Sequence, residues 1–366
     1  MLGTNNAPVN TYSFRDLTVW RTRLPDVRFA VLPPSNTRPN PLVVQDRVFV
    51  SVFAPGAICT LDREHGKLIW RRRIGKFAGA SVYLRGPRLF ATSCNTLFAM
   101  NSESGKVIWS FCPCGTDRES IYSSPAESHD RVFIGDRSGR LHCLDAANGK
   151  IIWTRLANSA RNSNVNSTPV VLDGQVIITT NAKTAMAYDI FSGKLAWRQK
   201  LDGPSGFGPL LLQSSVVAVA NSVYELNVRG TVHRHLEWRG EQVYVAEVTP
   251  RKIVVSFWPK TAERSDKTEF RQLTFVDRKS GSQRSLSFSA FCASFRYAAS
   301  SGLLYASHLN GVDILHPDEG TLLCKLKTKR DSRGGMGLVD VDNDKIYVLS
   351  GDGSVFALQH PRVGAH

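Results

Sequence analysis

The sequence predicts an all-β protein, an eight-bladed β-propeller with four-stranded antiparallel blades. A ten-residue pattern that ends in Gly-Lys, two apolar residues and Trp occurs four times, and its glycines lie 39, 44 and 44 residues apart. A repeat of about 40–45 residues is typical of propellers. Within each period, short runs rich in Val, Ile, Phe and Tyr alternate with Gly, Asp, Asn and Ser, which predicts strands joined by tight turns.

The third repeat shows the expected order of one blade. SSPAES at 123–128 is the innermost strand, RVFIGD at 131–136 the second, LHCLDA at 141–146 the third and IIWTRL at 151–156 the outermost. The Asp or Asn that ends the third strand can fix the following turn through its side chain. The glycine supplies a positive φ, and the large Trp ring can fill the wedge between neighbouring blades.

These repeat residues are expected to build the blades and to touch no ligand. They are Trp20, Trp70, Trp109, Trp153, Trp197, Gly66, Gly105, Gly149 and Gly193.

Weaker copies of the repeat complete the count of eight. They are residues 215–238, residues 252–288 with a charged insertion at 260–269, residues 302–326 with Cys324 in the place of Trp, and residues 345–360 without a fourth strand. Residues 17–26 resemble an outer strand with none before it. We expect this segment to complete the last blade, because ring closure hides the sheet edges.

The repeats together predict a single domain over residues 13–360, with the closing strand at 13–26. Residues 1–12 are expected to be a flexible N-terminus and residues 361–366 a C-terminal tail.

Composition narrows the class of protein. Of 366 residues, 42% are hydrophobic and 21% charged, and no run approaches the length of a membrane-spanning helix. The start, MLGTNNAPVNTYSFRD, has neither a charged beginning nor an apolar stretch, so no secretory signal is expected. Seven irregularly spaced cysteines then favour reduced thiols and a cytoplasmic location.

The formal charge of +15 indicates attraction to an acidic partner. Connections from each outer strand to the next innermost strand emerge on one face of a propeller, where basic side chains from distant segments would focus a positive potential. The alternative, that some of these charges point outward from strands and are merely solvated, stays open. The candidate partner-binding residues are Arg71, Arg72, Arg73, Lys76, Arg118, Arg161, Lys327, Lys329, Arg330 and Arg333.

With LDREHGKLIW, MNSESGKVIW, LDAANGKIIW and YDIFSGKLAW in hand, the chain resembles the PQQ-type β-propeller repeat family, the quinoprotein alcohol dehydrogenase-like propellers. The repeat of that family reads roughly Ala-x-Asp-x-x-Thr-Gly-x-x-x-Trp, and the resemblance spans nearly the whole chain. It implies either of two functions. One branch binds pyrroloquinoline quinone with Ca²⁺ or another metal and oxidises alcohols or sugars. The other, which includes the outer-membrane assembly lipoprotein propeller, lacks the cofactor and serves as an interaction scaffold.

The chain departs from both branches. FCPCG at 111–115 is Cys-x-Cys, whereas the enzymes often carry adjacent cysteines, and no Glu, Asn and Asp set aligns with their metal site. A four-ligand zinc site at FCPCG would need a second Cys or His pair, and none stands nearby in the sequence. The lipidation cysteine of the scaffold lipoprotein is missing too. No Ser–His–Asp, HExxH, P-loop or dinucleotide motif occurs.

The sequence therefore predicts a non-catalytic protein-interaction scaffold that holds no cofactor and no metal. Its most favoured partner is an acidic protein bound through a basic loop face, and the chain is expected to be a monomer or a subunit of a larger assembly. Two alternatives remain: a PQQ-dependent oxidoreductase with a divergent site, and a propeller that binds nucleic acid. Nucleic acid is a weaker candidate than an acidic protein, because most aromatic residues belong to strands and few stand beside the basic residues.

Overall fold

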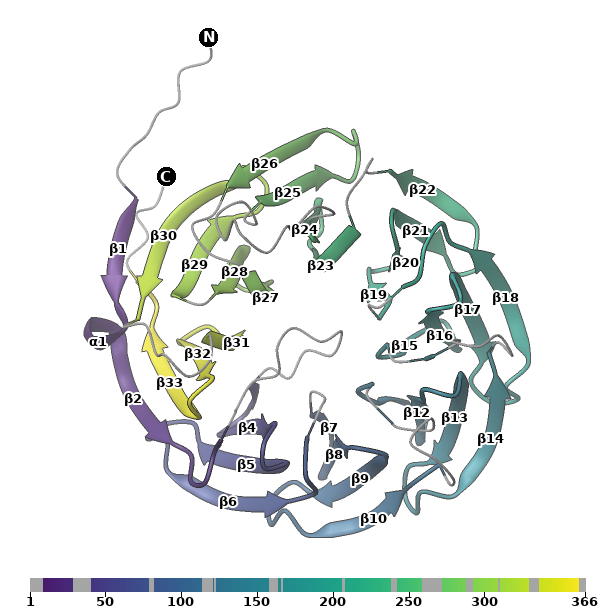
Figure 1. Cartoon of the computed structure of the whole chain (residues 1–366), viewed down its shortest axis with the longest axis horizontal. Helices are drawn as coiled ribbons and strands as arrows, with labels where there is room; N and C mark the ends of the chain where they lie inside the picture. Colours follow the sequence, from purple (N-terminus) through teal and green to yellow (C-terminus); the bar gives the residue numbers. More distant parts are fainter. Residues whose placement is uncertain are drawn as a thin grey trace, which may run out of the picture.

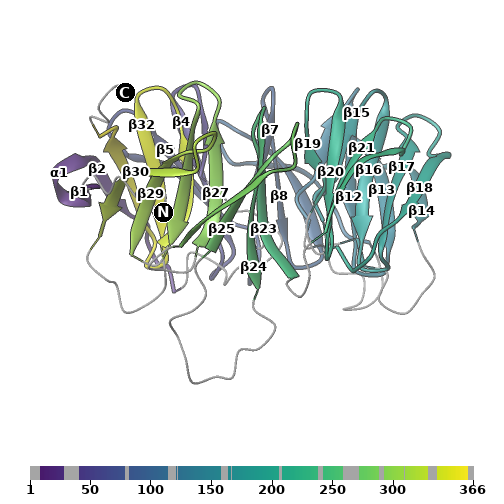
Figure 2. The same ribbon diagram turned by 90° about the horizontal axis from the view of Figure 1, so that it is seen from above.

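The computed structural model describes residues 9–28, 41–78, 82–113, 121, 123–157, 164–165, 167–205, 208–237, 242–258, 272–287, 292–308, 310–328 and 336–361. These residues form eight sheets arranged radially around a ring (Figure 1). Seen from the side, the ring is a flat disc whose strands run between its two faces (Figure 2). The predicted eight-bladed all-β propeller is confirmed.

Blades 1 to 4 each contain four antiparallel strands, which follow one another from the inside of the ring outward. Blade 1 has β3 (Leu42–Val44), β4 (Arg47–Val52), β5 (Ala57–Asp62) and β6 (Leu68–Arg73). Blade 2 has β7 (Tyr83–Arg85), β8 (Arg88–Ser93), β9 (Thr96–Asn101) and β10 (Val107–Phe111). Blade 3 has β11 (Ala126–Ser128), β12 (Arg131–Gly135), β13 (Arg140–Asp145) and β14 (Ile151–Leu156). Blade 4 has β15 (Val170–Leu172), β16 (Gln175–Thr180), β17 (Thr184–Asp189) and β18 (Leu195–Lys200).

Blades 5 to 8 continue the same order. Blade 5 has β19 (Leu210–Leu211), β20 (Ser215–Val219), β21 (Val223–Asn227) and β22 (Val232–Leu236). Blade 6 has β23 (Gln242–Val248), β24 (Lys252–Trp258), β25 (Gln272–Asp277) and β26 (Gln283–Ser287). Blade 7 has β27 (Cys292–Ala298), β28 (Leu303–His308), β29 (Gly311–His316) and β30 (Thr321–Lys327). Blade 8 has β31 (Met336–Val341), β32 (Lys345–Ser350), β33 (Ser354–Gln359) and the N-terminal β2 (Thr18–Arg23).

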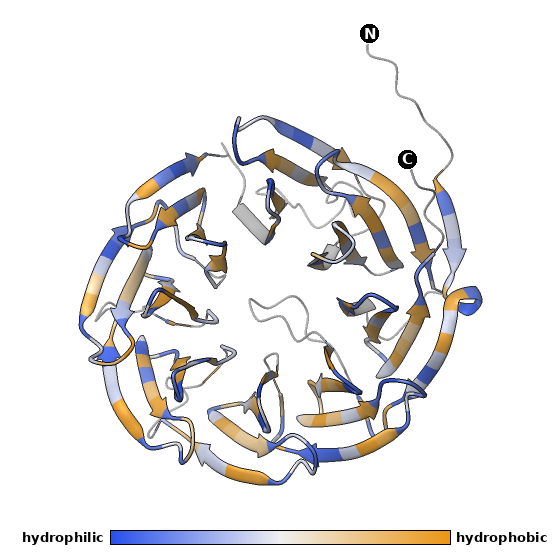
Figure 3. Cartoon of the chain, turned by 180° about the vertical axis from the view of Figure 1, so that it is seen from behind, coloured by the Kyte–Doolittle hydropathy of each residue, from blue (hydrophilic) through white to orange (hydrophobic). Residues whose placement is uncertain are grey.

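The core lies between the blades, around their two middle strands. In β4, β8 and β16 every residue after the first is buried, because each sheet packs against a neighbour on both faces. The two middle strands of the blades are accordingly mostly apolar, whereas the outermost strands mix apolar and polar residues (Figure 3). Among the described residues, no helix is long and apolar enough to cross a bilayer.

The N-terminal segment pairs with one strand in each of the last two blades and so connects these blades. β2 pairs antiparallel with β33, with Trp20 opposite Ala357, so the predicted closure of the ring is confirmed. Upstream, β1 (Asn10–Ser13) pairs in parallel with β30 and gives blade 7 a fifth strand that the sequence did not indicate. Between them, the single turn α1 (Phe14–Leu17) buries Phe14, whose ring meets Phe356 edge-on at 5.4 Å between centroids.

Candidate functional site

Five of the contacts between blades are built around a tryptophan of the outer strand. Each indole covers the turn glycine of the following blade so closely that a methyl group on that glycine would lie 2.4–2.7 Å from the ring. Each indole N–H donates a hydrogen bond of 2.9–3.2 Å to a backbone carbonyl of the same turn. The five pairs are Trp20 with Gly66, Trp70 with Gly105, Trp109 with Gly149, Trp153 with Gly193, and Trp197 with Gly230.

The turns that receive these rings are held by the aspartate or asparagine before them. Asp145, at the end of β13, accepts hydrogen bonds from the amides of Ala147 and Asn148 at 2.8 and 3.1 Å. Gly149 then adopts a φ of +73°, which other residues adopt only with strain. The repeat residues thus serve to join the blades, and the space for a ligand must be sought elsewhere.

Three of the predicted basic residues lie on a strand rather than in the connection that follows it. Arg71, Arg72 and Arg73 are the last residues of β6. Arg72 Nε donates to the carbonyl oxygen of Gly105 at 3.0 Å and so helps to hold blade 1 against blade 2. Arg71 Nη1 lies 3.4 Å from the Asp26 carboxylate. Part of this basic run therefore stabilises the ring itself.

Of the other predicted basic residues, only Lys76 and Lys327 lie within the described part of the chain. Lys76 is exposed and its Nζ lies 5.4 Å from the centre of the Phe77 ring, while Lys327 is the exposed last residue of β30. The outer strands follow one another around the ring in the same sense (Figure 1), so β6 and β30 end at the same face. The rest of the set lies outside the described residues: Arg118, Arg161, Lys329, Arg330 and Arg333.

At the contact between blades 5 and 6, no tryptophan stands at the repeat position among the described residues. Arg234 occupies its place on β22, opposite Glu225 of β21 and Val217 of β20. In blade 3 the same row across the sheet reads Phe133, Cys143 and Trp153. Two large rings are thus replaced by a valine and an arginine, and the small third residue by a glutamate. Among the described residues, the nearest atom to a methyl built on Gly281, the turn glycine of blade 6, is an Arg234 nitrogen at 3.9 Å.

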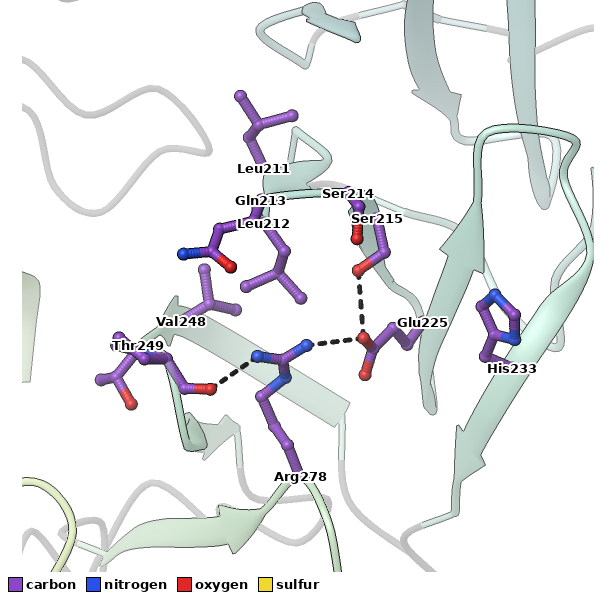
Figure 4. A pocket seen from close by; sticks show the side chains of 11 residues that line it. Leu211, Leu212, Gln213, Ser214, Ser215, Glu225, His233, Val248, Thr249 and Arg278 are labelled. Atoms are coloured by element: carbon purple, nitrogen blue, oxygen red, sulfur yellow. Dashed lines mark hydrogen bonds and ion pairs between the residues drawn. The ribbon is translucent and has the colours of Figure 1, made fainter. Parts of the chain in front are cut away.

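A cavity of about 480 Å³ lies between blades 5 and 6, bordered by Glu225 of this row and by the turn residue Arg278. Arg278, from the turn after β25, reaches across it to the Glu225 carboxylate at 2.7 Å (Figure 4). Ser215 donates to the same carboxylate at 3.0 Å, and Arg278 Nη1 donates to the Pro250 carbonyl at 2.7 Å. The lining residues come from both blades: Leu211, Leu212, Gln213, Ser214, Ser215, Glu225 and His233, with Val248, Thr249, Pro250 and Arg278.

The charges in this cavity are balanced within it. Burial alone would favour protonated Glu225, but the hydrogen bonds from Arg278 and Ser215 outweigh burial and lower the pKa of the carboxyl group. Glu225 is therefore a carboxylate at neutral pH, and its charge compensates that of Arg278. A ligand with a large net charge of either sign would disturb this pair, so the cavity suits a neutral, partly apolar group.

The contact between blades 6 and 7 has no tryptophan on the described outer strand β26 and also holds a cavity, of about 390 Å³. Arg284 of β26 reaches the following turn and donates to the Glu319 carbonyl at 2.5 Å. Between blades 7 and 8, the place of the tryptophan belongs to Cys324, which is buried in one cluster with Phe14. Among the described residues, the outer strands at the contacts on both sides of blade 6, β22 and β26, thus carry arginines and no tryptophan.

Within the described residues, no group of three or more His, Cys, Asp or Glu side chains is arranged to hold a metal ion. Cys59, Cys143 and Cys324 are buried, and burial raises the pKa of each thiol to about 12. Such thiols stay protonated at neutral pH and act as small apolar core residues. Of the predicted Cys-x-Cys pair, Cys112 is exposed and Cys114 lies outside the described residues.

The ring of eight blades and its docked indoles define a propeller built from PQQ-type repeats. A model of the family described as outer membrane protein assembly factor BamB matches residues 13–126 and 97–360. Because these two matches together span nearly the whole chain, the protein belongs to this family of propellers. A search of curated proteins finds no match.

Solved structures with TM-scores above 0.7 share the fold at low sequence identity. A computationally designed protein, Ika8, is 14% identical with a TM-score of 0.72, over 94% of this chain and all of that one. Quinohemoprotein alcohol dehydrogenase from Comamonas testosteroni is 10% identical with a TM-score of 0.73, over 96% of this chain and 77% of the enzyme. BamB from Moraxella catarrhalis is 18% identical with a TM-score of 0.49, over 94% of this chain and 99% of that one.

Sequence reasoning missed the cavity between blades 5 and 6, although its signal is present. Aligning residues 215–238 with the first four repeats places Arg234 where they have Trp, and Glu225 where they have Thr, Ala or Cys. A charged residue at an otherwise small, buried position indicates an altered contact between blades.

Proposed function

We propose that the protein is a non-catalytic scaffold that binds an acidic protein partner through the loop face, the face where the outer strands end. The observation that carries this proposal is the match of residues 13–360 to a family described as an assembly factor. The net charge of +15 supports an acidic partner, since a basic surface speeds encounter with it and selects against basic competitors. A closed ring supplies a stiff support on which binding loops keep their positions.

The first experiment compares two charge reversals of equal size. In the loop-face variant, Arg73, Lys76, Lys327 and Lys329 are changed to Glu; Arg72 is spared because it bonds the Gly105 carbonyl. In the control variant, the exposed turn lysines of the opposite face, Lys67, Lys106, Lys150 and Lys194, are changed to Glu. Each variant and the wild type serve as bait in affinity capture from native lysate, with and without nuclease.

A protein partner captured by the wild type and the control variant after nuclease treatment, but lost by the loop-face variant, supports the proposal. We expect a loss of at least tenfold, because each charge contact at an interface that desolvates contributes on the order of 1 kcal/mol. Capture that disappears with nuclease favours a nucleic-acid-binding propeller instead. Equal capture by both variants contradicts the loop face as the binding surface.

The dehydrogenase neighbours, with TM-scores of 0.72 and 0.73, motivate a second experiment on the same protein. Purified wild type is incubated with pyrroloquinoline quinone and Ca²⁺ and assayed for alcohol oxidation. The scaffold proposal predicts no turnover above that of the quinone alone. Turnover that depends on the protein would establish an enzyme.

A further inference from the structure

We propose that the cavity between blades 5 and 6 receives a tryptophan side chain presented by a partner polypeptide. The cavity opens at the face of the turns that join β19 to β20, β23 to β24 and β25 to β26, since its lining residues 212–214, 249–250 and 278 belong to these turns. It is therefore a second binding surface, opposite the loop face, and does not depend on the partner proposed above.

The chain itself shows what fits such a place. In five contacts between blades an indole lies on the turn of the following blade, and its N–H donates to the carbonyl of the residue just after the Asp or Asn of the turn. The turn of blade 6 has the same construction: Asp277 accepts from the amides of Lys279 and Ser280, and Gly281 has a φ of +75°. Blade 6 thus has the receiving turn, while blade 5 carries Arg234 at the position of the indole.

The turn of blade 6 offers an acceptor for an indole N–H at Arg278, a residue that lines the cavity. The Arg278 carbonyl occupies the position of Ala146 and Ile190 in the other turns, whose carbonyls accept from Trp109 and Trp153. Among the described residues, no hydrogen bond to the Arg278 carbonyl is formed. The N–H of a bound indole would donate to this carbonyl, as Trp109 and Trp153 donate to the carbonyls of Ala146 and Ile190. This atom gives tryptophan an advantage over an aliphatic side chain or phenylalanine.

The other walls suit an aromatic ring. Leu211, Leu212 and Val248 supply apolar surface, and Leu211 is 48% exposed at the cavity mouth. The Arg278 guanidinium crosses the cavity toward Glu225 (Figure 4), and its buried Nε–H has no partner within the described part of the chain. An arginine against an indole is already found in this ring, where the Arg155 guanidinium lies 5.6 Å from the Trp153 ring centre.

The cavity is also large enough for the residue proposed. Its volume of about 480 Å³ falls in the range of pockets that bury small ligands. A side chain that enters from a partner segment would lie against the Arg278–Glu225 pair, and no indole of the described residues lies within 4 Å of a methyl built on Gly281. Only the Arg234 side chain, which reaches the Lys279 carbonyl at 3.3 Å, borders the space over Gly281 among the described residues.

The test uses the tripeptide acetyl-Gly-Trp-Gly-amide as the probe and its Phe and Leu counterparts for comparison. Binding to the full-length protein is followed by saturation-transfer NMR and by calorimetry. We expect binding of the Trp peptide with a Kd on the order of 1 mM, as suits one anchoring side chain, and at least fivefold weaker binding of the Phe and Leu peptides.

A variant that fills the space from within provides the decisive comparison. Arg234→Trp restores the missing indole and should abolish binding of the Trp peptide while raising the Tm, which also shows that the variant is folded. Ser214→Trp, at a residue that lines the cavity, should block binding by a second route. Lys200→Trp, on the exposed end of β18, adds the same side chain away from the cavity and should leave binding unchanged.

The proposal is overturned by no binding of the Trp peptide to the wild type at about ten times the expected Kd, or by equal binding to the wild type and to both cavity-filling variants. Equal binding of the Leu peptide would show a nonspecific apolar pocket and would overturn it too. The loop-face charge reversal should leave peptide binding intact, so failure of the scaffold proposal and failure of this one are distinguishable.

Discussion

Gly149 and Trp109 show how a single pair of residues sets the distance between two blades. The glycine is required twice, once for its φ of +73° and once because the indole of the preceding blade leaves no room for a side chain. Gly174, in the turn between β15 and β16, has nearly the same φ of +70° but nothing within 4 Å of the position of a methyl group. Comparing the two positions therefore distinguishes the effect of backbone strain, present at both, from the effect of packing against the indole, present only at Gly149.

Replacing each of these glycines with alanine should give different losses of stability. Both variants carry the strain of a positive φ, about 1 kcal/mol, whereas Gly149→Ala must also push the Trp109 ring aside from 2.6 Å. We expect Gly149→Ala to lower the free energy of unfolding by about 1–3 kcal/mol more than Gly174→Ala, measured by urea denaturation. Equal losses would mean that the indole does not fix the turn.

At the scale of elements, the closing strand β2 depends on a charged turn as well as on its ladder. Asp352, in the turn between β32 and β33, forms an ion pair with Arg23 at the end of β2 and accepts a hydrogen bond from the Ser354 amide at 2.8 Å. Burial opposes ionisation of this carboxyl group, but these bonds outweigh burial and lower its pKa. The ionised form of Asp352 thus stabilises the closed ring.

This arrangement predicts a pH dependence with a definite sign. A carboxylate whose pKa is lowered by folding contributes stability that is complete above its unfolded pKa, near 3.8, and is lost as the pH falls through the folded value. At pH 7 the variant Asp352→Asn should be less stable than the wild type by about 1–2 kcal/mol. The difference should shrink below about pH 4, measured by urea denaturation between pH 7 and pH 3. A difference that stays constant over this range would contradict the assigned role of Asp352.

The sequence was sufficient for the elements that repeat and insufficient for those that occur once. The spacing of Gly66, Gly105, Gly149 and Gly193 predicted the blades, and the orphan strand around Trp20 predicted the closure that β2 makes with β33. The parallel pairing of β1 with β30 escaped notice, because a four-residue strand, Asn10–Ser13, carries too few residues for a periodic pattern.

The candidate sites were predicted less well, for a physical reason. The position of Arg72 depends on how far β6 extends, and sequence patterns fix the ends of strands poorly. The cavity beside Arg278 depends on which residues of three strands face one another, namely Val217, Glu225 and Arg234, and on a side chain from the next blade. Such a register is a property of the folded sheet and is read only by comparing whole blades.

For the whole molecule, the ring consists of two parts that differ in how their blades are joined. The contacts from blade 8 through blade 5 are closed by five indoles, while those on both sides of blade 6 hold arginines and cavities of about 480 and 390 Å³. Buried aromatic contacts with a satisfied N–H stabilise more than partly exposed arginines. The first part should therefore be the more stable one, and the second the part that can receive a partner.

Hydrogen exchange of the wild type beside Arg234→Trp tests this division most directly. The comparison uses equivalent third strands, β13 and β17 in the indole-closed part and β21 and β25 on either side of the open contact. We predict that β21 and β25 exchange at least about tenfold faster than β13 and β17 in the wild type, and that Arg234→Trp slows exchange in β21 and β25 alone. Uniform protection of all four strands, or no change in β21 and β25 in the variant, would contradict the claim that indoles determine how tightly the blades are joined.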